Sequence, residues 1–434
     1  MNDGFTLAAE LVHKVSDRQV GPCRLIVLPY ESEGLVSVAG SVASFPDIAA
    51  GEDQLQALVN AMLDKGTRHR DQFEIARALE SVGAERAYSG GAARVRFSGR
   101  SLKKAVGSLV GVIAEELREP LFDARQFDLL KQRMIAKLRQ SIHRTGILAS
   151  DALHRHWFES DHPNHSRSIS TELLLLGAAD IEELRSLHAS HFGSDDLIVV
   201  MVGDIKPDPA AAVVARAFGG WREARSTPTF SVDARRSPRK RREDIRVPDK
   251  PSIDVVLGIA VPITRGSPEF LPLMVGNFVL GGNFSSRLMQ RIRDDMGLTY
   301  GVRSSLTGVS IHHDMLWEIH VTLGEEVLET GIIEIQKLVR ELAVGGITGQ
   351  ELERAKETLT GAYLVRQDSS GNMAHTILVN TERGDPVRQL ADYPLEVEAV
   401  TQDQVNRALA SYLRAEDFSI AAAGTLSARK DVNT

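Results

Sequence analysis

The sequence contains the same succession of segments twice, and this internal repeat limits the fold more than any other feature. Late in each half, a helical segment and a polar turn precede a short apolar strand, and the two strands end at Gly203 and Gly424. Earlier in each half, a turn leads into a long helical segment, at residues 117–140 and 342–367. Self-similarity of this kind indicates one structural unit used twice. We therefore expect two homologous domains.

Length and local composition agree with that division. A chain of 434 residues is too long for one ordinary domain and can bury two separate cores. Between the halves, residues 222–252 are charged, rich in proline and without a hydrophobic period, as expected of a linker. We predict an N-terminal domain over residues 1–221, a linker over residues 222–252, and a C-terminal domain over residues 253–434.

Each half begins with a strand candidate. The segment GLVSVAGSVASF, residues 34–45, alternates with period two, and IDVVLGIAVP, residues 253–262, is a nearly continuous apolar run. Helical segments follow each strand along the chain. The sequence therefore predicts an α+β fold in which each domain is an antiparallel sheet with helices packed on one face.

A helix is predicted from Glu52 to Lys65, ending at a left-handed Gly66. Its apolar residues recur at helical spacing and form one stripe, made of Leu55, Leu58, Val59, Met62 and Leu63. A second stripe beside it has only small or polar members, which are Ala57, Asn60, Ala61 and Asp64. We expect the second stripe to face a cavity or a partner.

The segment LQALVNAMLDKGT, followed by FEIARALESVGAE, resembles the insulinase/pitrilysin family of zinc peptidases. In that family the helix reads H-x-x-E-H before a segment of the type M-L-F-K-G-T; the two histidines bind zinc and the glutamate activates water. Aligned on KGT at residues 65–67, the histidine positions fall on Ala57 and Ala61, and the glutamate position falls on Asn60. None of the three family residues is present.

The third zinc ligand of the family is a glutamate on a later helix, and its position falls on Lys137. An ammonium group repels zinc rather than binding it. The resemblance therefore implies a helix that keeps its packing face and has lost its metal ligands. We expect no metal or other cofactor in this chain.

The second half keeps a different part of the family pattern. A helix is expected over residues 267–282, with Ser267 as N-cap, Pro268 at its first position and a stop at the two glycines 281–282. The following segment NFSSRLMQRIRDDMGLTYGVRSS is similar to the family signature G-G-F-S-S-R-L…R-x-x-x-x-L-x-Y. Within it, the arginine and tyrosine of the family fall on Arg293 and Tyr300.

In the family this pair reaches the zinc site of the facing domain, orients the substrate and stabilises the tetrahedral intermediate. The chemistry is reasonable, because a guanidinium and a phenol can both donate to a developing oxyanion. The alternative is that Arg293 and Tyr300 only pack at a corner between a helix and a strand. The surrounding signature favours the functional interpretation.

Two other segments are interpreted as structural. Four histidines lie within twelve residues, but their spacing and the loop signalled by Pro163 favour a structural or solvated cluster over a metal site; they are His154, His156, His162 and His165. The glycine-rich VLGGNFSS lacks the Lys-Ser/Thr of a phosphate-binding loop, so it is interpreted as a helix end with a hinge.

Charge and targeting signals limit the partners. A net charge of −7 argues against nucleic acid, and the basic stretch RRSPRKRRED is interpreted as a solvated part of the linker. The single cysteine, Cys23, excludes an internal disulfide framework. No signal peptide and no apolar run of membrane-spanning length are recognised. We expect a cytoplasmic protein without membrane contact, or a periplasmic one if a leader has been removed.

The resemblance covers residues 25–426 and implies a non-catalytic subunit of a heterodimeric zinc metallopeptidase, built as half of a clamshell. A homologous partner would carry the intact H-x-x-E-H and the zinc, while this chain would supply Arg293, Tyr300 and part of the chamber wall. Peptide substrates would bind partly by adding a strand to a sheet edge. The alternative is a catalytically silent structural or assembly subunit of the same descent. An independent hydrolase has no residue set to support it.

Overall fold

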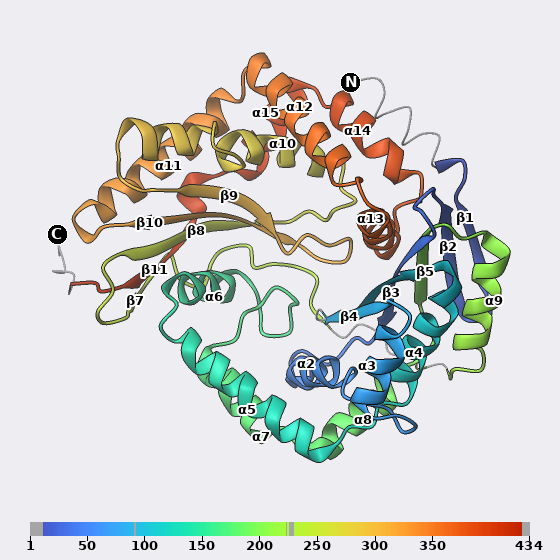
Figure 1. The fold of residues 1–434 in the computed structure, drawn as a ribbon. Helices are drawn as coiled ribbons and strands as arrows, with labels where there is room; N and C mark the ends of the chain where they lie inside the picture. The colour runs from blue at the N-terminus through green and yellow to red at the C-terminus, as the bar shows by residue number, and fades with distance from the viewer. Residues whose placement is uncertain (1–11, 91–92, 223, 225–229, 428–434) are drawn as a thin grey trace. The chain divides into compact units, whose positions relative to one another are not determined.

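The computed structural model describes residues 12–90, 93–222, 224 and 230–427. The chain divides into two compact units, each assembled from three segments. Unit 1 contains Met1–Ala136, Leu173–Phe230 and Gly361–Leu395. Unit 2 contains Lys137–Glu172, Ser231–Thr360 and Glu396–Thr434. Figure 1 shows the sheet of each unit with its surrounding helices.

Each unit is built on one sheet. The sheet of unit 1 has, in spatial order, the strands β1 (Ser16–Val20), β2 (Cys23–Pro29), β6 (Leu197–Gly203), β3 (Leu35–Ala43), β5 (Arg94–Leu102) and β4 (Glu85–Gly90). The sheet of unit 2 has the strands β7 (Arg242–Arg246), β11 (Ser419–Gly424), β8 (Ile253–Val261), β10 (Met315–Leu323) and β9 (Val302–Thr307). Except for the additional β1, the two orders correspond strand for strand. The repeat predicted from the sequence is therefore present in the topology.

The sheets are mainly antiparallel, as predicted, with one parallel pair in each. These pairs are β2 with β6 in unit 1 and β7 with β11 in unit 2. They occupy the same place in the two strand orders. The parallel pair therefore recurs at the same place in both sheets. The predicted α+β class with two homologous sheets is confirmed.

Helices surround both sheets. In chain order they are α2 (Glu52–Met62), α3 (Gln72–Glu80), α4 (Val106–Arg118), α5 (Ala124–Ser141), α6 (Thr145–Trp157), α7 (Ile169–Ala178), α8 (Ile181–His191), α9 (Pro207–Phe218), α10 (Phe270–Gly281), α11 (Leu328–Gly345), α12 (Gly349–Val365), α13 (Ser370–Glu382), α14 (Gln389–Ala399) and α15 (Gln402–Tyr412). Short turns of 3-10 helix precede α4, α11 and β11, and a π-helical segment, η2 (Met289–Asp295), precedes β9.

The prediction that helices cover only one face of each sheet is wrong. In unit 2, α6 packs on β8 and β11 from one side, while α10 and α11 lie on the other side (Figure 1). In unit 1, α13 packs on β3 and β6, and α4 and α9 contact β5 and β2. The second face of each sheet is covered because a strand that is apolar on both faces needs burial on both.

The helices α6 and α13 are exchanged between the halves of the sequence. Helix α6 comes from the first half and belongs to unit 2, whereas α13 comes from the second half and belongs to unit 1. The predicted bounds 1–221 and 253–434 follow the sequence repeat. The compact units differ from them because residues 137–172 belong to unit 2 and residues 361–395 belong to unit 1. Contacts between distant segments, which no local pattern records, decide the division.

Part of the predicted linker is a strand. Within residues 222–252, β7 pairs in parallel with β11 at the end of the unit 2 sheet. Its charged side chains are suited to an end strand, where Arg242 forms ion pairs with Asp244 and Glu329. The prediction of a linker without regular structure is therefore wrong for Arg242–Arg246.

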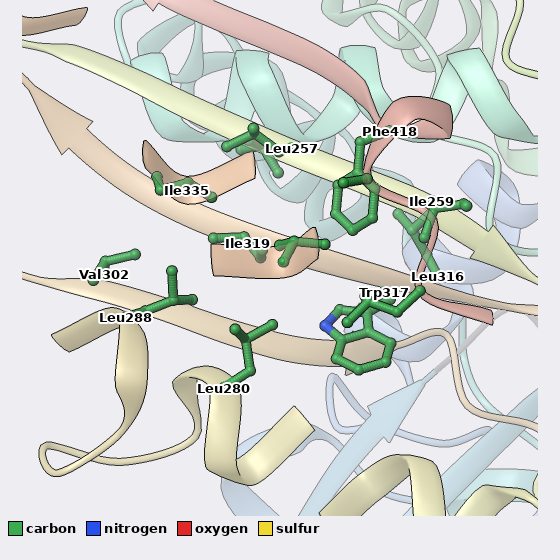
Figure 2. Close-up of a cluster of buried hydrophobic side chains, with 14 of the residues drawn as sticks. Leu257, Ile259, Leu280, Leu288, Val302, Leu316, Trp317, Ile319, Ile335 and Phe418 are labelled. Carbon is green, nitrogen blue, oxygen red and sulfur yellow. The ribbon is translucent and has the colours of Figure 1, made fainter. Parts of the chain in front are cut away.

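The core of unit 2 lies on both faces of its sheet, against α10 and α11 on one face and against α6 on the other. Figure 2 shows apolar side chains of this core, among them Trp317, Leu280 and Ile335. The Trp317 side chain is fully buried and donates its indole N–H to Ser304 Oγ at 2.7 Å. Ser304 in turn donates to Asn277 Oδ1 at 2.7 Å, which ties α10 to β9. The buried indole N–H of Trp317 is thus satisfied.

Local signals fix several helix ends. Asp180 and Thr401 form capping boxes at the starts of α8 and α15, the paired helices of the repeat. The predicted N-cap Ser267 is wrong: α10 begins at Phe270, after a turn in which Ser267 Oγ accepts from Thr264 N at 3.0 Å. Gly66 has φ 112°, in agreement with the predicted left-handed end after α2.

Among the described residues, no helix is both long and apolar enough to cross a membrane.

Candidate functional site

Helix α2 carries three of the four positions that the sequence aligns with the catalytic residues of the zinc peptidases. The predicted apolar stripe is present: Leu55 is half-buried, and the others are at most 1% exposed, namely Leu58, Val59, Met62 and Leu63. On the neighbouring stripe, Ala57, Asn60 and Ala61 are half-buried. Methyl and amide groups do not replace imidazole and carboxylate as zinc ligands, so α2 does not fit the metal.

Asn60 packs against the end of β4. Its Nδ2 lies 1.7 Å from the place where a Cβ on Gly90 would stand, so the amide uses the space that glycine leaves open. Its Oδ1 is buried and has no hydrogen-bond partner among the described residues. Asn60 lies three residues before the buried Leu63. On α10, Asn277 lies three residues before the buried Leu280 and accepts a hydrogen bond from Ser304 of the end strand β9. These contacts are structural in both repeats.

Lys137 lies on α5 at the residue where this helix passes from unit 1 to unit 2. Its side chain is exposed, and it makes no ion pair with any described residue. The ammonium group supplies no carboxylate for a metal. Together with the three α2 positions, Lys137 leaves the family's zinc site without any of its ligands.

The ionisable groups beside α2 are engaged with one another. The fully buried Glu116 of α4 accepts two hydrogen bonds from Arg86, at 2.6 and 2.5 Å, and one from Tyr88 Oη at 2.6 Å. Burial raises the pKa of Glu116, although hydrogen bonds from Arg86 and Tyr88 act in the opposite direction. Within the described ranges, no three His, Cys, Asp or Glu side chains gather as metal ligands would.

Arg293 and Tyr300 lie together in unit 2. The Cζ atom of Arg293 is 5.2 Å from the centroid of the Tyr300 ring and 5.8 Å from that of Phe284, both within the range of cation–π contacts. The two rings are exposed, Tyr300 by 90% and Phe284 by 80%. The nearest carboxylate oxygen to Arg293 is on its neighbour Asp294, 3.7 Å from Nε. The pair predicted from the sequence is therefore adjacent and accessible.

Local chain geometry brings this pair together. After α10, Asn283 Oδ1 accepts from the backbone N of Ser285 at 2.9 Å, which turns the chain toward η2. Arg293 lies in the π-helical η2, a conformation often found at functional sites. The left-handed Gly297, with φ 64°, then turns the chain back, and Thr299 Oγ1 donates to Thr322 O at 2.7 Å, which fixes Tyr300 just before β9.

A cavity of about 1120 Å³ opens beside the Arg293–Tyr300 pair, entirely within unit 2. We call it the unit 2 cavity. Its walls come from the first turns of α6, from β8, β9 and β10, and from the turn after α10. Apolar side chains form much of its lining, including Val256, Met289, Val302 and Val321. Tyr300 and Phe284 belong to the lining as well.

The histidines of residues 154–165 have separate structural partners. His156 is buried between Ser419 Oγ and Glu243 Oε2, at 2.5 and 3.0 Å. Ser419 donates its own proton to Lys240 O and is fully buried, so this Ser–His–Glu group is no nucleophilic triad.

His154 and His165 bond backbone oxygens, and His162 is buried and stacks on Phe158 with 4.3 Å between ring centroids. In this structure the four histidines thus contact protein groups.

Two features of the site were not predicted from the sequence. The first is the exposed Phe284, which lies inside the quoted signature. Its place between two glycines and two serines was a signal of an exposed contact surface. The contribution of α6 to the unit 2 cavity had no local signal, because α6 comes from the other half of the sequence.

Comparison with known proteins agrees with the fold. The family model described as "Peptidase M16 inactive domain" matches residues 178–359, which include Arg293 and Tyr300. A Helicobacter pylori relative named non-peptidase homolog YmxG is 23% identical over 369 residues, 85% of this chain and 83% of that protein. The mitochondrial-processing peptidase subunit beta of Lentinula edodes is 22% identical over 386 residues, 85% of this chain and 81% of that protein.

Among solved structures, the peptidase M16 inactive domain from Pseudomonas fluorescens has the same fold, with a TM-score of 0.82 at 22% identity, and the match covers 96% of this chain and 100% of that one. The resemblance to the insulinase/pitrilysin peptidases that the sequence predicted is thus confirmed: residues 178–359 match the peptidase M16 inactive domain, and the chain has the fold of a solved domain of that description.

Proposed function

We propose that this chain is the non-catalytic subunit of a heterodimeric zinc metallopeptidase that degrades or processes peptides. A homologous partner carries the intact H-x-x-E-H and the zinc. This chain supplies Arg293 and Tyr300 to the partner's active site, together with part of the wall that encloses the substrate. The relative named as a peptidase subunit supports such an arrangement.

The exposure of Tyr300 is the observation that carries this proposal. A tyrosine that only packs at a corner buries its ring, because each buried aromatic ring stabilises the fold. Tyr300 is instead 90% exposed, and its hydroxyl has no hydrogen-bond partner among the described residues. It nevertheless stands beside the Arg293 guanidinium. An aromatic ring and a cation held together at the surface are suited to meeting another molecule.

The pair has the chemistry that peptide hydrolysis needs. A guanidinium and a phenol both donate hydrogen bonds, and donors fixed before the reaction stabilise the oxyanion that develops on the scissile carbonyl. The rings of Tyr300 and Phe284 restrict the orientations of the Arg293 side chain. Less conformational entropy is then lost when the guanidinium binds the transition state.

Peptide substrates can bind along the sheets. The strands β4 and β9 stand at the ends of their sheets, where backbone N–H and C=O groups are available to an added strand. Strand addition recognises the main chain rather than particular side chains. This supports a broad class of extended or unfolded peptides as substrates.

A structural or assembly role is the second candidate. The missing ligands at Ala57, Asn60, Ala61 and Lys137 favour it, as does the name of the Helicobacter pylori relative, non-peptidase homolog. The exposed Arg293–Tyr300 pair counts against it, because a scaffold has no use for two accessible hydrogen-bond donors beside a cavity.

Reconstitution tests the proposal. The chain is mixed with a homologous H-x-x-E-H protein from the same organism, the complex is isolated by size exclusion, and turnover of an unfolded fluorogenic peptide is measured. We expect a stable pair, hydrolysis by the pair, and loss of turnover on the order of a hundredfold in Arg293→Ala. The control Arg340→Met removes an exposed arginine on α11 and should leave turnover unchanged.

Two outcomes would count against the proposal. Failure of the proteins to associate removes the heterodimer. Association with wild-type turnover in Arg293→Ala leaves the assembly role and removes this chain from the chemistry.

A further inference from the structure

The unit 2 cavity combines an apolar floor with unpaired positive charge on its lining, which is the arrangement that suits an apolar group ending in a carboxylate. We propose that it binds the carboxyl-terminal end of an extended peptide, with the last side chain on the floor and the terminal carboxylate at Arg144 and Arg303. The inference rests on the proposed function in taking a peptide as the ligand, and it assigns the part of the peptide that this chain holds.

The floor is well suited to an apolar side chain. Ile147 of α6 and Val256 of β8 line the cavity, and Val256 lies on the same face of the sheet as Arg303, because both residues pair with His320. They are held by α6 and by the sheet, so the surface is formed before a ligand arrives. A volume of about 1120 Å³ is at the upper end of ordinary ligand sites, which span roughly 300–1,000 Å³, and it admits several residues of a peptide.

The charge on the lining is positive. Arg144, just before α6, and Arg303, on β9, are exposed and have no acidic partner among the described residues. The one carboxylate in the lining, Asp254, is already satisfied, since it accepts from Thr145 Oγ1 at 2.5 Å and from Thr322 Oγ1 at 2.6 Å. Arginine binds carboxylates well because its planar fork can donate two parallel hydrogen bonds.

Two further features favour an anion over a neutral group. Arg144 is the N-cap of α6 and makes no side-chain capping bond, so the positive end of this helix faces the same lining. His320, also in the lining, has its Nε2 buried and 3.3 Å from Glu318 Oε1, so this nitrogen does not face a ligand. The arginines are therefore the groups available to a carboxylate.

The position of β9 favours a peptide over a fatty acid. β9 is the end strand of its sheet, and it contributes both Val302 and Arg303 to the lining. An extended peptide paired with β9 can therefore enter the cavity with its last residue. Tyr300 borders the same cavity, so a peptide held there passes the proposed catalytic pair.

The corresponding cavity in unit 1 has no unpaired arginine among its described lining residues, so the free positive charge is a property of the unit 2 cavity. That cavity has a volume of about 820 Å³ and lies beside the N-terminal end of α13, as the unit 2 cavity lies beside that of α6. Its three arginines are all paired, Arg86 with Glu116, Arg96 with Glu382 and Arg100 with Glu85. Its lining also contains two glutamates without a cationic partner among the described residues, Glu31 and Glu33. This cavity does not suit a carboxylate.

The test uses the isolated full chain and a short fluorescein-labelled peptide of glycine and serine that ends in leucine. Fluorescence anisotropy compares the free acid with its C-terminal amide and with an acid that ends in serine. We expect the leucine acid to bind about tenfold more tightly than its amide, because a hydrogen-bonded charge is lost. The serine acid should also be weaker, because the floor is then left unfilled.

Variants place the effect in the cavity. Arg144→Met and Arg303→Met should each reduce the preference for the acid, while Arg340→Met on α11 should leave it unchanged. Thermal unfolding confirms that each variant is folded. The comparison of acid with amide needs only the wild-type chain, so the proposal can fail even if a variant does not fold.

Three results would overturn the proposal: equal affinity for acid and amide, an acid preference that survives in both arginine variants, or binding of dodecanoate with no binding of either peptide. The assay contains neither partner nor zinc. If Arg293→Ala leaves turnover unchanged while the acid preference holds, the proposed function fails and the cavity assignment stands. If Arg293→Ala lowers turnover while the acid and the amide bind equally well, the cavity assignment fails and the proposed function stands.

Discussion

The two units share one strand order and differ at the place where a helix meets the end strand. In unit 1, the helix at that place is α2, and the charged groups beside it turn inward, since Arg86 and Tyr88 both donate to the buried Glu116. In unit 2, the corresponding helix is α10, and the charged groups after it turn outward, with Arg293 beside the exposed Tyr300. The same fold therefore carries a closed site in one unit and an open site in the other.

The two cavities differ in the same sense. Both lie beside the N-terminal end of an exchanged helix, but the cavity of unit 1 has paired arginines and that of unit 2 has unpaired ones. By contrast, the central strands of the two sheets correspond to one another in order. The two units therefore differ most at the end strands and the cavity linings, where a substitution changes the chemistry at little cost in packing. The accessible pair and the unpaired arginines both lie in unit 2.

The exchanged helices give the largest expected effect. Trp157 on α6 is 2% exposed and donates to Gly258 O at 3.0 Å, so Trp157→Ala should cost about 3–5 kcal/mol of unfolding free energy. Loss of amide-exchange protection should appear in β8 and β11 of unit 2. The matched change Ile377→Ala on α13 should cost about 2–5 kcal/mol and affect β3 and β6 of unit 1. Effects confined to the half of the sequence that carries the substitution would contradict the exchange.

A smaller effect is expected at the other end of α13. Glu382 is 5% exposed at its side chain and accepts from Arg96 Nη2 at 2.5 Å, with Arg94 Nε 3.5 Å away. Breaking a buried ion pair costs about 3–5 kcal/mol, and because Arg96 is partly exposed we expect about 3 kcal/mol for Glu382→Gln. Urea unfolding measures it, with the exposed Glu80→Gln on α3 as control. Equal stability of the two variants would show that α13 is held by apolar contacts alone.

Acid should destabilise both units through one buried histidine in each. Burial lowers the pKa of His162 in unit 2 and of His188 in unit 1 from 6.5 to about 4. The unfolded chain then binds the proton more readily, so stability is lost as the pH falls from about 6.5 to about 4. We expect about 2 kcal/mol of loss per histidine between pH 6.5 and pH 5.

The substitutions His162→Phe and His188→Phe should therefore flatten the pH dependence of unfolding, each in its own unit. Urea midpoints between pH 4 and pH 7 measure the slope, whatever the substitutions cost at neutral pH. An unchanged slope in both variants would show that other groups cause the acid loss.

The smallest effect is expected from rebuilding the zinc motif in unit 1. The isolated chain should hold no stoichiometric zinc after dialysis, because α2 has no ligand for it. The triple change Ala57→His, Asn60→Glu and Ala61→His should still give no tight site, because Lys137 supplies no third ligand. Elemental analysis decides this. One tightly bound zinc per wild-type chain would contradict the conclusion that unit 1 carries a closed site without metal ligands.

The sequence predicted those parts of the fold that local patterns decide. Period two identified β3, the apolar runs identified β6, β8 and β11, and the helical stripe identified the buried face of α2. It did not predict the positions of α6 and α13, because an amphipathic stripe shows that a face is buried but not which sheet covers it. It also missed β7, whose charged residues are typical of a linker and equally tolerated on an end strand.

The candidate site was predicted only where a motif recorded it. The spacing in the signature placed Arg293 next to Tyr300, and the structure brings their side chains to 5.2 Å. The unit 2 cavity was missed, because Arg144 and Arg303 are separated by more than a third of the chain and meet only through the exchanged helix. No local pattern can report a contact of that kind.

The most direct test of the account is the kinetics of Tyr300→Phe in the reconstituted pair. This change removes the hydroxyl and keeps the ring beside Arg293, so assembly and the cation–π contact are preserved. Because the donor acts on charge that develops only in the transition state, we predict kcat lower on the order of a hundredfold with KM and the zinc content of the partner unchanged. A wild-type kcat from the assembled variant would contradict the claim that this chain contributes Tyr300 to catalysis.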